Sequence, residues 1–363
     1  MNIEQYGWNP AWEQKFKTVS QEHGGKQLEP GRIVGDFGSK YRVMTDQGEL
    51  WGELSGKLRH ETGISGDYPA IGDWVALMLT DAGEQGIIHR VLPRSSMISR
   101  QAAGNVIAEQ IIASNVDILF LVSALNDDFN VRRMERYLIM AWNSGATPVI
   151  LLTKADLCDD AERKIAEMEK AAPGVAVHAV SALQDSGRDA LLPYIGTGQT
   201  VALTGSSGCG KSTMVNWLCG RTIQRTQDVR EGDSRGRHTT THRELFVMPS
   251  GGIIIDTPGM RELQLWNGDG GLDMAFGDVT ALAAGCRFSD CRHEHEEGCA
   301  VLEAVRSGVL EEKRLQNYRK TGKELLYQSV KEGKAKKKLE SVQGKTKPPR
   351  PRSNVWLKEY EEL

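Results

Sequence analysis

The sequence predicts a multidomain protein: an all-β barrel, then a central α/β domain, then an α-helical segment with a Cys/His cluster. Short alternating stretches predict the barrel, and strand-helix alternation from about 110 to 265 predicts the α/β domain. Three of the six cysteines fall between Cys286 and Cys299. We expect five segments: an N-terminal extension over 1–27, the barrel over 28–97, the α/β domain over 98–268, the helical domain over 269–332, and a basic flexible tail over 333–363.

The barrel segment contains short stretches of alternating polarity separated by Gly, Asp and Ser turn residues. Several short strands in so small a segment are typical of an OB-fold, which binds oligonucleotides. A β-module without a ligand is the alternative. The expected strands cover residues 31–34, 41–44, 49–53 and 73–79.

The central segment opens with a continuous apolar run over 116–122, as expected for a parallel strand that is buried on both faces. Helical periodicity follows over 131–143, and the alternation of strand and helix then continues. This pattern predicts an α/β domain with a mainly parallel sheet. Further strands are expected over 148–152, 175–180, 200–204, 245–248 and 252–255, with helices over 159–171 and up to 218.

A phosphate-binding loop is predicted where Gly205-Ser-Ser-Gly-Cys-Gly-Lys-Ser212 follows a strand and precedes a helix. Glycines let backbone N–H groups surround phosphates, and the helix N-terminus favours negative charge. Lys211 would reach the β- and γ-phosphates, and the Ser212 hydroxyl would bind Mg²⁺. A chance glycine-rich turn is the alternative, which the strand-loop-helix context disfavours. The expected binding residues are Gly205, Ser206, Ser207, Gly208, Cys209, Gly210, Lys211, Ser212 and Thr213.

A base-recognition motif, Thr153-Lys-Ala-Asp156, closes another apolar strand. The Asp156 carboxylate would accept hydrogen bonds from N1–H and the exocyclic amine of guanine, and the Lys154 stem would cover the base. Most GTPases carry Asn where this chain has Thr153. Ser181 and Ala182, after the strand over 175–180, match the partner loop of such a site; helix capping is the alternative for Ser181.

Two switch segments are expected around the γ-phosphate. Asp256-Thr-Pro-Gly259 follows a strand, so Asp256 would lie near Mg²⁺ and the Gly259 N–H would contact the γ-phosphate. Thr240, in the Thr-rich run 239–241, is the expected Mg²⁺ ligand of the other switch; a solvated loop is the alternative. The long irregular stretch around it, over 221–243, is of the kind that is usually functional.

The group that positions the attacking water is not the usual glutamine, because Met260 follows Gly259. Methionine neither donates nor accepts a proton. Either hydrolysis is intrinsically poor, or another group positions the water. His238, in the first switch, is the expected group, since histidine relays protons near neutral pH. An exposed loop histidine without a catalytic role is the alternative.

The Cys/His cluster has the spacing Cys286-x4-Cys291-x-His293-x5-Cys299. Three thiolates and one imidazole suit a single structural Zn²⁺ with tetrahedral coordination, and they leave no open position for catalysis. His295 is a competing ligand, and unrelated buried cysteines are the alternative.

The bulk composition restricts partners and location. The net charge of −3 gives no overall attraction to nucleic acid, so basic surface must be local, as in the Lys/Arg-rich tail. No apolar run reaches about 18 residues, and the N-terminus lacks the features of a secretory signal. We expect no membrane contact, a cytoplasmic location and, since no oligomerisation motif is visible, a monomer.

The order of the motifs is permuted: base recognition precedes the phosphate loop, whereas ordinary GTPases have the reverse order. This order, the Gly236-Arg-His-Thr-Thr-Thr241 switch and the Cys/His cluster resemble the ribosome-small-subunit-dependent GTPase A family, RsgA or YjeQ, over about residues 28–330. Gly56-Lys-Leu-Arg59 and Gly72-Asp-Trp-Val75 are also similar to that family's N-terminal domain.

The resemblance implies an OB-fold, a circularly permuted GTPase domain and a zinc domain. It also implies a late assembly factor that binds 16S rRNA in the 30S subunit, hydrolyses GTP to GDP in response and is then released. It further implies that His238 assists hydrolysis. A P-loop ATPase or kinase and an RNA-binding nucleotide sensor without stimulated hydrolysis are the alternatives. The permuted order places Asp256-Thr-Pro-Gly259 shortly before Cys286, which suggests that the switch acts directly on the zinc module.

Overall fold

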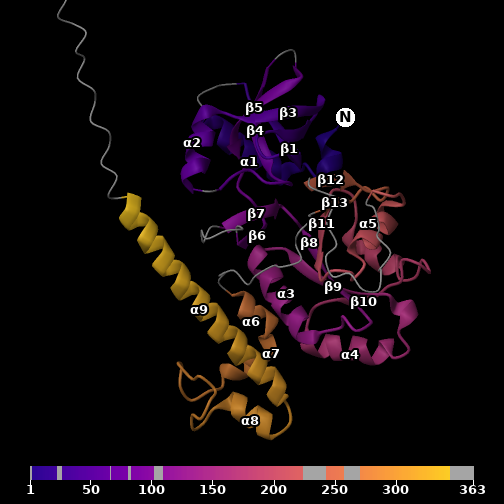
Figure 1. The fold of residues 1–363 in the computed structure, drawn as a ribbon, viewed down its shortest axis with the longest axis vertical. Helices are drawn as coiled ribbons and strands as arrows, with labels where there is room; N and C mark the ends of the chain where they lie inside the picture. The colour runs from indigo at the N-terminus through magenta and orange to yellow at the C-terminus, as the bar shows by residue number, and fades with distance from the viewer. Residues whose placement is uncertain are drawn as a thin grey trace, which may run out of the picture.

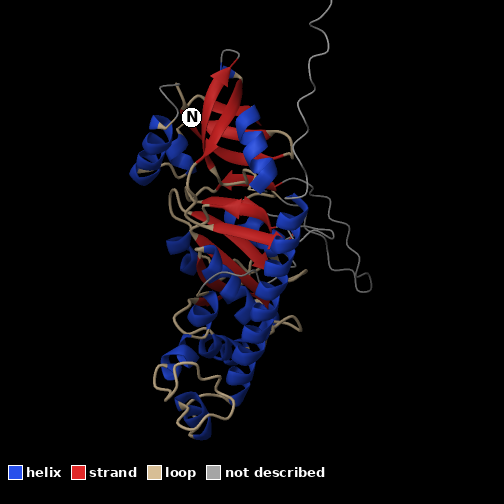
Figure 2. Ribbon diagram, turned by 90° about the vertical axis from the view of Figure 1, so that its left-hand side faces the viewer, coloured by secondary structure: helices blue, strands red, loops and turns tan. Residues whose placement is uncertain are grey.

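The computed structural model describes residues 2–22, 27–65, 67–80, 83–101, 109–223, 243–256 and 270–343. The barrel lies at one end, the α/β sheet in the middle and the C-terminal helices at the other end (Figure 1). The strands lie in the first two parts, and the C-terminal part consists of helices and loops (Figure 2). Among the described helices, none combines the length and the hydropathy that a membrane span requires.

The barrel has five strands in the order β1-β2-β3-β5-β4, and β4 pairs with β1 to close it. All neighbouring pairs are antiparallel except β3 and β5, which run parallel. Ile33, Val43 and Leu77 are among the fully buried side chains that fill the interior. The predicted OB-like barrel is confirmed. Its elements are β1 (Glu29–Asp36), β2 (Tyr41–Thr45), β3 (Gly48–Leu54), α2 (Gly56–Ser65), β4 (Trp74–Thr80) and β5 (Gln85–Val91).

The α/β sheet confirms the predicted parallel arrangement. Strands β10, β9, β8, β11 and β13 are parallel neighbours, and only β12 runs antiparallel, beside β13. Alternate residues of β8 enter cores on opposite faces, with Leu119 and Leu121 on one side and Phe120 and Val122 on the other. The elements are β8 (Ile118–Ala124), α3 (Val131–Ser144), β9 (Thr147–Thr153), η3 (Ala155–Leu157), α4 (Ala161–Ala171), β10 (Val177–Ala179), η4 (Asp189–Tyr194), β11 (Thr200–Gly205), α5 (Lys211–Cys219), β12 (Arg243–Val247) and β13 (Ile253–Asp256).

One sheet of eleven strands passes from the α/β region into the barrel. The junction is the antiparallel pair β12–β1, with Gly35 opposite Glu244 and Asp36 opposite Arg243. Arg42 on β2 forms an ion pair with Glu244 at 2.7 Å across the same junction. The sequence did not indicate this pairing, because nothing in either strand specifies its partner.

The N-terminal segment folds against the barrel instead of extending away from it. It forms η1 (Ile3–Tyr6) and α1 (Pro10–Gln21), and the Asn9 side chain caps α1 by accepting from the N–H groups of Ala11 and Trp12. The Trp8 ring lies 4.8 Å from that of the buried Trp74. Aromatic burial therefore holds this segment in place.

Arg32 joins the N-terminal segment, the barrel and the α/β sheet. Its side chain is buried, and burial lowers its pKa to about 10, so it stays charged at neutral pH. It donates to the carbonyl of Tyr6 and, at 2.9 Å, to the hydroxyl of Thr200 on β11. It also donates to the carbonyls of Gly72 at 3.3 Å and Asn115 at 3.4 Å.

The C-terminal region is helical, as predicted, and packs on α3 through α6. It contains α6 (Gly271–Ala275), α7 (Gly277–Ala283), α8 (Ala300–Arg306) and α9 (Glu312–Gln343). The buried Arg314 of α9 donates to Glu135 of α3 at 2.7 Å and to Asp278 of α7 at 2.8 Å. In Figure 1, α9 runs past α7 and α6.

Two features differ from the expected elements. Helix α9 continues to Gln343, so residues 333–343 of the expected flexible tail are helical; Lys, Ala, Glu and Leu in this stretch are good helix formers. A hairpin of β6 (Met97–Gln101) and β7 (Glu109–Ser114) lies where no strand was expected. Its strands have five and six residues, which is too short for a clear periodic signal.

Replacing Arg32 should weaken the whole assembly. Arg32→Met leaves several buried acceptors without their donor, and we expect it to lower the free energy of unfolding by about 3 kcal/mol. Arg90→Gln, which breaks a half-exposed pair with Glu61, is the control and should cost below about 1 kcal/mol. Denaturant unfolding of both variants measures the difference, and equal midpoints would contradict this account.

Candidate nucleotide-binding site and metal centre

The predicted nucleotide motifs meet at the carboxyl edge of the parallel sheet. The phosphate loop follows β11, the base-recognition motif follows β9 and the partner loop follows β10. Because these strands are parallel and close in the sheet, their loops emerge on the same side. The permuted chain order therefore leaves these loops at the same edge of the sheet.

The phosphate loop has the backbone that its glycines permit. A Cβ on Gly205 would lie 2.2 Å from the carbonyl oxygen of Val122, so only glycine fits there. Gly208 and Gly210 have φ of 77° and 95°, and α5 begins at Lys211. The Lys211 ammonium donates to the carbonyls of Gly205 at 2.8 Å and Ser206 at 2.5 Å. It thus lies over the loop that would hold phosphates.

The other expected residues of the loop differ in exposure. Ser207 and Gly208 are exposed, as the surface of a phosphate cradle must be, whereas Cys209 is buried. Burial raises the pKa of the Cys209 thiol, so this side chain packs as a small apolar group. Ser212 and Thr213 lie half-buried in the first turn of α5.

Thr153 connects the base-recognition strand to the phosphate loop. Its buried hydroxyl donates to the carbonyl of Cys209 at 2.6 Å. A buried hydroxyl needs such a partner, and this one fixes the end of β9 against the loop after β11. Most GTPases have asparagine where this chain has Thr153. The threonine still links the base-recognition motif directly to the phosphate loop.

The base-recognition motif and its partner loop are also joined. Lys154 adopts the left-handed conformation with φ of 58°, and Asp156 follows in η3, where it is partly exposed. The Ala155 N–H donates to the carbonyl of Val180 at 3.3 Å. Immediately after Val180, Ser181 is buried and Ala182 is half-buried.

Asp128 contacts the phosphate loop but was not predicted. Its carboxylate accepts a hydrogen bond from the Ser206 hydroxyl and another from Arg133 at the start of α3. The signal was present in the sequence: a polar cluster, residues 126–130, follows the buried strand β8. The other loops at this edge were predicted from nucleotide-binding motifs, which residues 126–130 do not contain.

The switch residues are only partly within the described chain. Asp256 is the last residue of β13, and its backbone pairs with Glu244. The register of β13 against β11 sets Ile255 beside Ala202, so Asp256 lies on the phosphate-loop side of the sheet. His238, Thr240 and the run 239–241, with Gly259 and Met260, lie outside the described residues.

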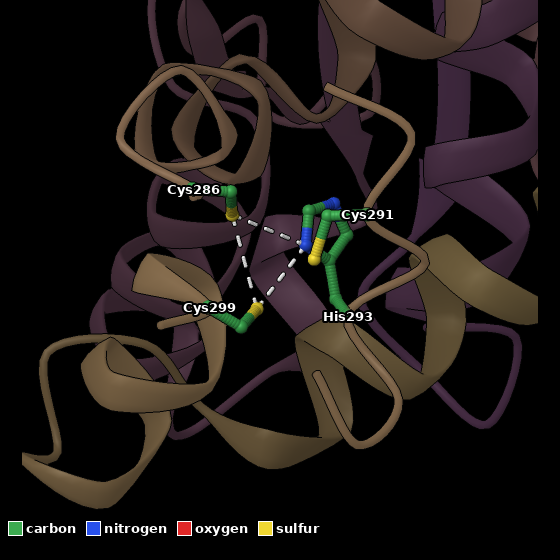
Figure 3. A group of neighbouring side chains, drawn as sticks. All are labelled: Cys286, Cys291, His293 and Cys299. Carbon is green, nitrogen blue, oxygen red and sulfur yellow. Dashed lines mark hydrogen bonds between the residues drawn. The ribbon is translucent and has the colours of Figure 1, made fainter. Parts of the chain in front are cut away.

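Four predicted metal ligands converge in the C-terminal region (Figure 3). The ligand atoms of Cys286, Cys291, His293 and Cys299 lie within 4.8 Å of one another. The Cys286 and Cys299 sulfurs are 3.8 Å apart, and His293 Nδ1 is 3.6 Å and 3.3 Å from them respectively. Tetrahedral Zn²⁺ with Zn–S of about 2.3 Å would set sulfur–sulfur distances of about 3.8 Å.

The protein around the cluster supports ligation. Burial lowers the pKa of His293, which favours the neutral imidazole that binds metals. The Cys299 sulfur caps α8 by accepting from the Leu302 N–H at 3.4 Å, and the His293 ring lies 6.3 Å from that of Tyr318 on α9. His295, the competing ligand, is not a member of the cluster of ligand atoms. A metal here would hold α8 and the preceding loop against α9.

Comparison with known proteins agrees with this geometry. Residues 91–266 match the RsgA GTPase family model. The small ribosomal subunit biogenesis GTPase RsgA 2 of Lactiplantibacillus plantarum is 47% identical over 300 residues, which cover 83% of this chain and 84% of the relative. The RsgA protein of Methanosarcina acetivorans is 42% identical over 333 residues, covering 91% and 88% respectively.

A solved structure resembles the fold as a whole. The crystal structure of YjeQ from Thermotoga maritima matches with a TM-score of 0.63 and 26% sequence identity, over 83% of this chain and 99% of that one. The relatives in sequence cover more than four fifths of the chain at over 40% identity. The chain therefore belongs to the RsgA GTPase family.

Proposed function

We propose that this protein is a GTPase of small ribosomal subunit biogenesis, which binds the 30S subunit through 16S rRNA and hydrolyses GTP to GDP and phosphate. Hydrolysis is stimulated by the subunit and followed by release. The observation that carries the proposal is the Thr153–Cys209 hydrogen bond, which joins the predicted base-recognition motif directly to the predicted phosphate loop. Relatives named as small ribosomal subunit biogenesis GTPases supply the cellular setting.

In this site the residues from Gly205 to Thr213 hold the phosphates. Lys211 exchanges its two carbonyl partners for the β- and γ-phosphates, so its ammonium is charge-compensated when the nucleotide binds. Ser212 and Thr240 would hold the Mg²⁺ that the triphosphate brings, with Asp256 near it, and that ion would offset the negative charge of the phosphates. The Gly259 N–H detects the γ-phosphate.

Guanine is recognised by Asp156, whose carboxylate pairs with N1–H and the exocyclic amine, while Lys154 and the Ser181-Ala182 loop enclose the base. Adenine offers neither donor in that arrangement. Binding adenine would leave the carboxylate unpaired, and that loss discriminates strongly between the two bases.

The cluster of Cys286, Cys291, His293 and Cys299 holds one structural Zn²⁺. The donor set is soft, and its spacing fits tetrahedral zinc without an open position. The metal stabilises the loop between α7 and α8 and contributes folding free energy, not chemistry.

Contact with rRNA is supported by the two outer modules. On the barrel, the half-exposed Trp51 of β3 stacks edge-to-face on Phe37 at 5.3 Å, which offers an aromatic surface to an unpaired base. The basic C-terminal residues add phosphate contacts. The protein acts as a monomer in the cytoplasm, where its subunit partner resides.

The proposal predicts base preference and stimulation together. GTP turnover should exceed ATP turnover by at least about 100-fold, because adenine leaves Asp156 without partners. Purified 30S subunits should raise the GTP rate, and 50S subunits serve as the control. Phosphate release under steady-state conditions measures both effects. Equal turnover rates for ATP and GTP would indicate a general P-loop ATPase. A GTP turnover rate that 30S subunits do not change would indicate an RNA-binding sensor.

His238 should act in the chemical step. We expect His238→Ala to lower kcat for GTP by about 100-fold at saturating GTP and 30S, with little change in KM, because a proton relay acts only in the transition state. His60→Ala on the exposed face of α2 is the control. Unchanged kcat in the His238 variant rules out this role.

Metal content tests the centre. Protein purified without chelator should contain about one equivalent of zinc per chain by mass spectrometry. Cys291→Ser should lose most of it and melt at lower temperature, since a structural site contributes to folding. Cys158→Ser replaces a half-buried cysteine outside the cluster and should retain the metal. The assignment is contradicted if the wild-type protein is purified without metal and added zinc leaves its melting temperature unchanged.

A further inference from the structure

We propose that Asp185, Arg188 and Trp217 form a clasp that positions the partner loop of the base site and thereby sets the affinity for guanine nucleotide. The clasp joins the loop after β10 to α5, the helix that begins at the phosphate loop. This inference rests on the proposed nucleotide site. It assigns positioning residues that none of the nucleotide motifs contains.

The partner loop is a closed turn with a strained residue. Ser181 and Ser186 exchange two backbone hydrogen bonds, of 3.0 and 2.9 Å, and the Ser181 hydroxyl oxygen accepts from the Gln184 N–H at 3.2 Å. Asp185 has φ of 51°, in the left-handed region that costs energy for a side chain other than glycine. Such a conformation persists only where surrounding contacts hold it.

The contacts that hold Asp185 come from α5. The indole N–H of Trp217 donates to the Asp185 carboxylate at 2.6 Å. Arg188, after the loop, donates to the Trp217 carbonyl, and its guanidinium lies 5.2 Å from the centre of the Trp217 ring. Arg188 also lies 3.9 Å from the Asp185 carboxylate. Three side chains from two elements thus form one connected group.

The loop depends on the clasp because its strand gives little support. Strand β10 has three residues and lies at the edge of the sheet, paired only with β9. Two other links complete the pocket: Thr153 to Cys209, and Ala155 to Val180. The clasp is a third link, between the loop after β10 and α5. It sets the distance between this loop and the helix that begins at the phosphate loop.

The clasp is a positioning device more than a source of stability. The Asp185 side chain is 70% exposed and that of Arg188 36%, and exposed ion pairs add little to global stability. Its effect should therefore appear in nucleotide affinity, while the melting temperature barely changes. A preorganised loop raises affinity because less ordering is needed on binding.

The test measures GDP affinity, GTP kinetics and melting temperature of the full-length chain. Trp217→Phe removes the donor and Asp185→Ala the acceptor, and each should raise the Kd for GDP and the KM for GTP by about 3- to 10-fold. The kcat and the melting temperature should stay close to wild type. Asp185→Asn keeps an acceptor oxygen and tolerates the left-handed conformation, so it should retain most of the affinity.

Controls separate the clasp from the pocket itself. The double variant Asp185→Ala/Trp217→Phe should lose no more affinity than either single one, because both changes break the same contact. Asp189→Ala, a nearby exposed aspartate outside the clasp, should bind like wild type. Asp156→Asn should lower the affinity for GTP relative to that for xanthosine triphosphate, whether or not the clasp affects nucleotide affinity.

The outcomes are distinguishable. If wild-type protein prefers ATP or binds no nucleotide, the proposed function fails. If wild-type protein binds GDP and Trp217→Phe binds it equally well, the clasp is overturned. Additive losses in the double variant, or losses that track a fall in melting temperature, also overturn it, because they indicate a general structural effect.

Discussion

The parallel pairing of β9, β8, β11 and β13 is the constraint on which the rest of this structure depends. Parallel strands deliver all their following loops to one edge, so the motifs meet there whatever their order in the chain. The Thr153–Cys209 hydrogen bond then fixes two of these loops at contact distance. A permuted chain is tolerated because the positions of these loops are set by strand neighbours and not by chain connectivity.

The same sheet determines how the barrel is attached. The barrel continues it through the β12–β1 pair, and Arg32 fills the corner where the N-terminal segment, the barrel and β11 meet. The barrel is therefore joined to the nucleotide domain by backbone hydrogen bonds as well as by a buried cation.

Within the described residues, the C-terminal module is attached to the α/β domain through α3. Residues 257–269, the covalent connection after Asp256, lie outside the described chain. Within the described residues, the module rests on α3, where Glu135 meets Arg314 and Arg136 meets Glu324. Helix α3 begins just after Asp128, which contacts Ser206 of the phosphate loop. The module and the nucleotide loop thus share one helix as a neighbour.

The sequence alone determined the fold class, the strand-loop-helix around residues 205–212 and the four Cys and His side chains that the structure brings together. These rest on local chemistry: hydrophobic period, glycine spacing, and thiolate and imidazole donors within a short stretch. It did not reveal the β12–β1 junction, the corner at Arg32, the place of Asp128 or the Asp185–Trp217 contact. Each of these contacts joins residues far apart in the chain. The residues around a strand edge, a buried cation or an indole N–H do not indicate which distant group will form a hydrogen bond with it. Only packing decides that.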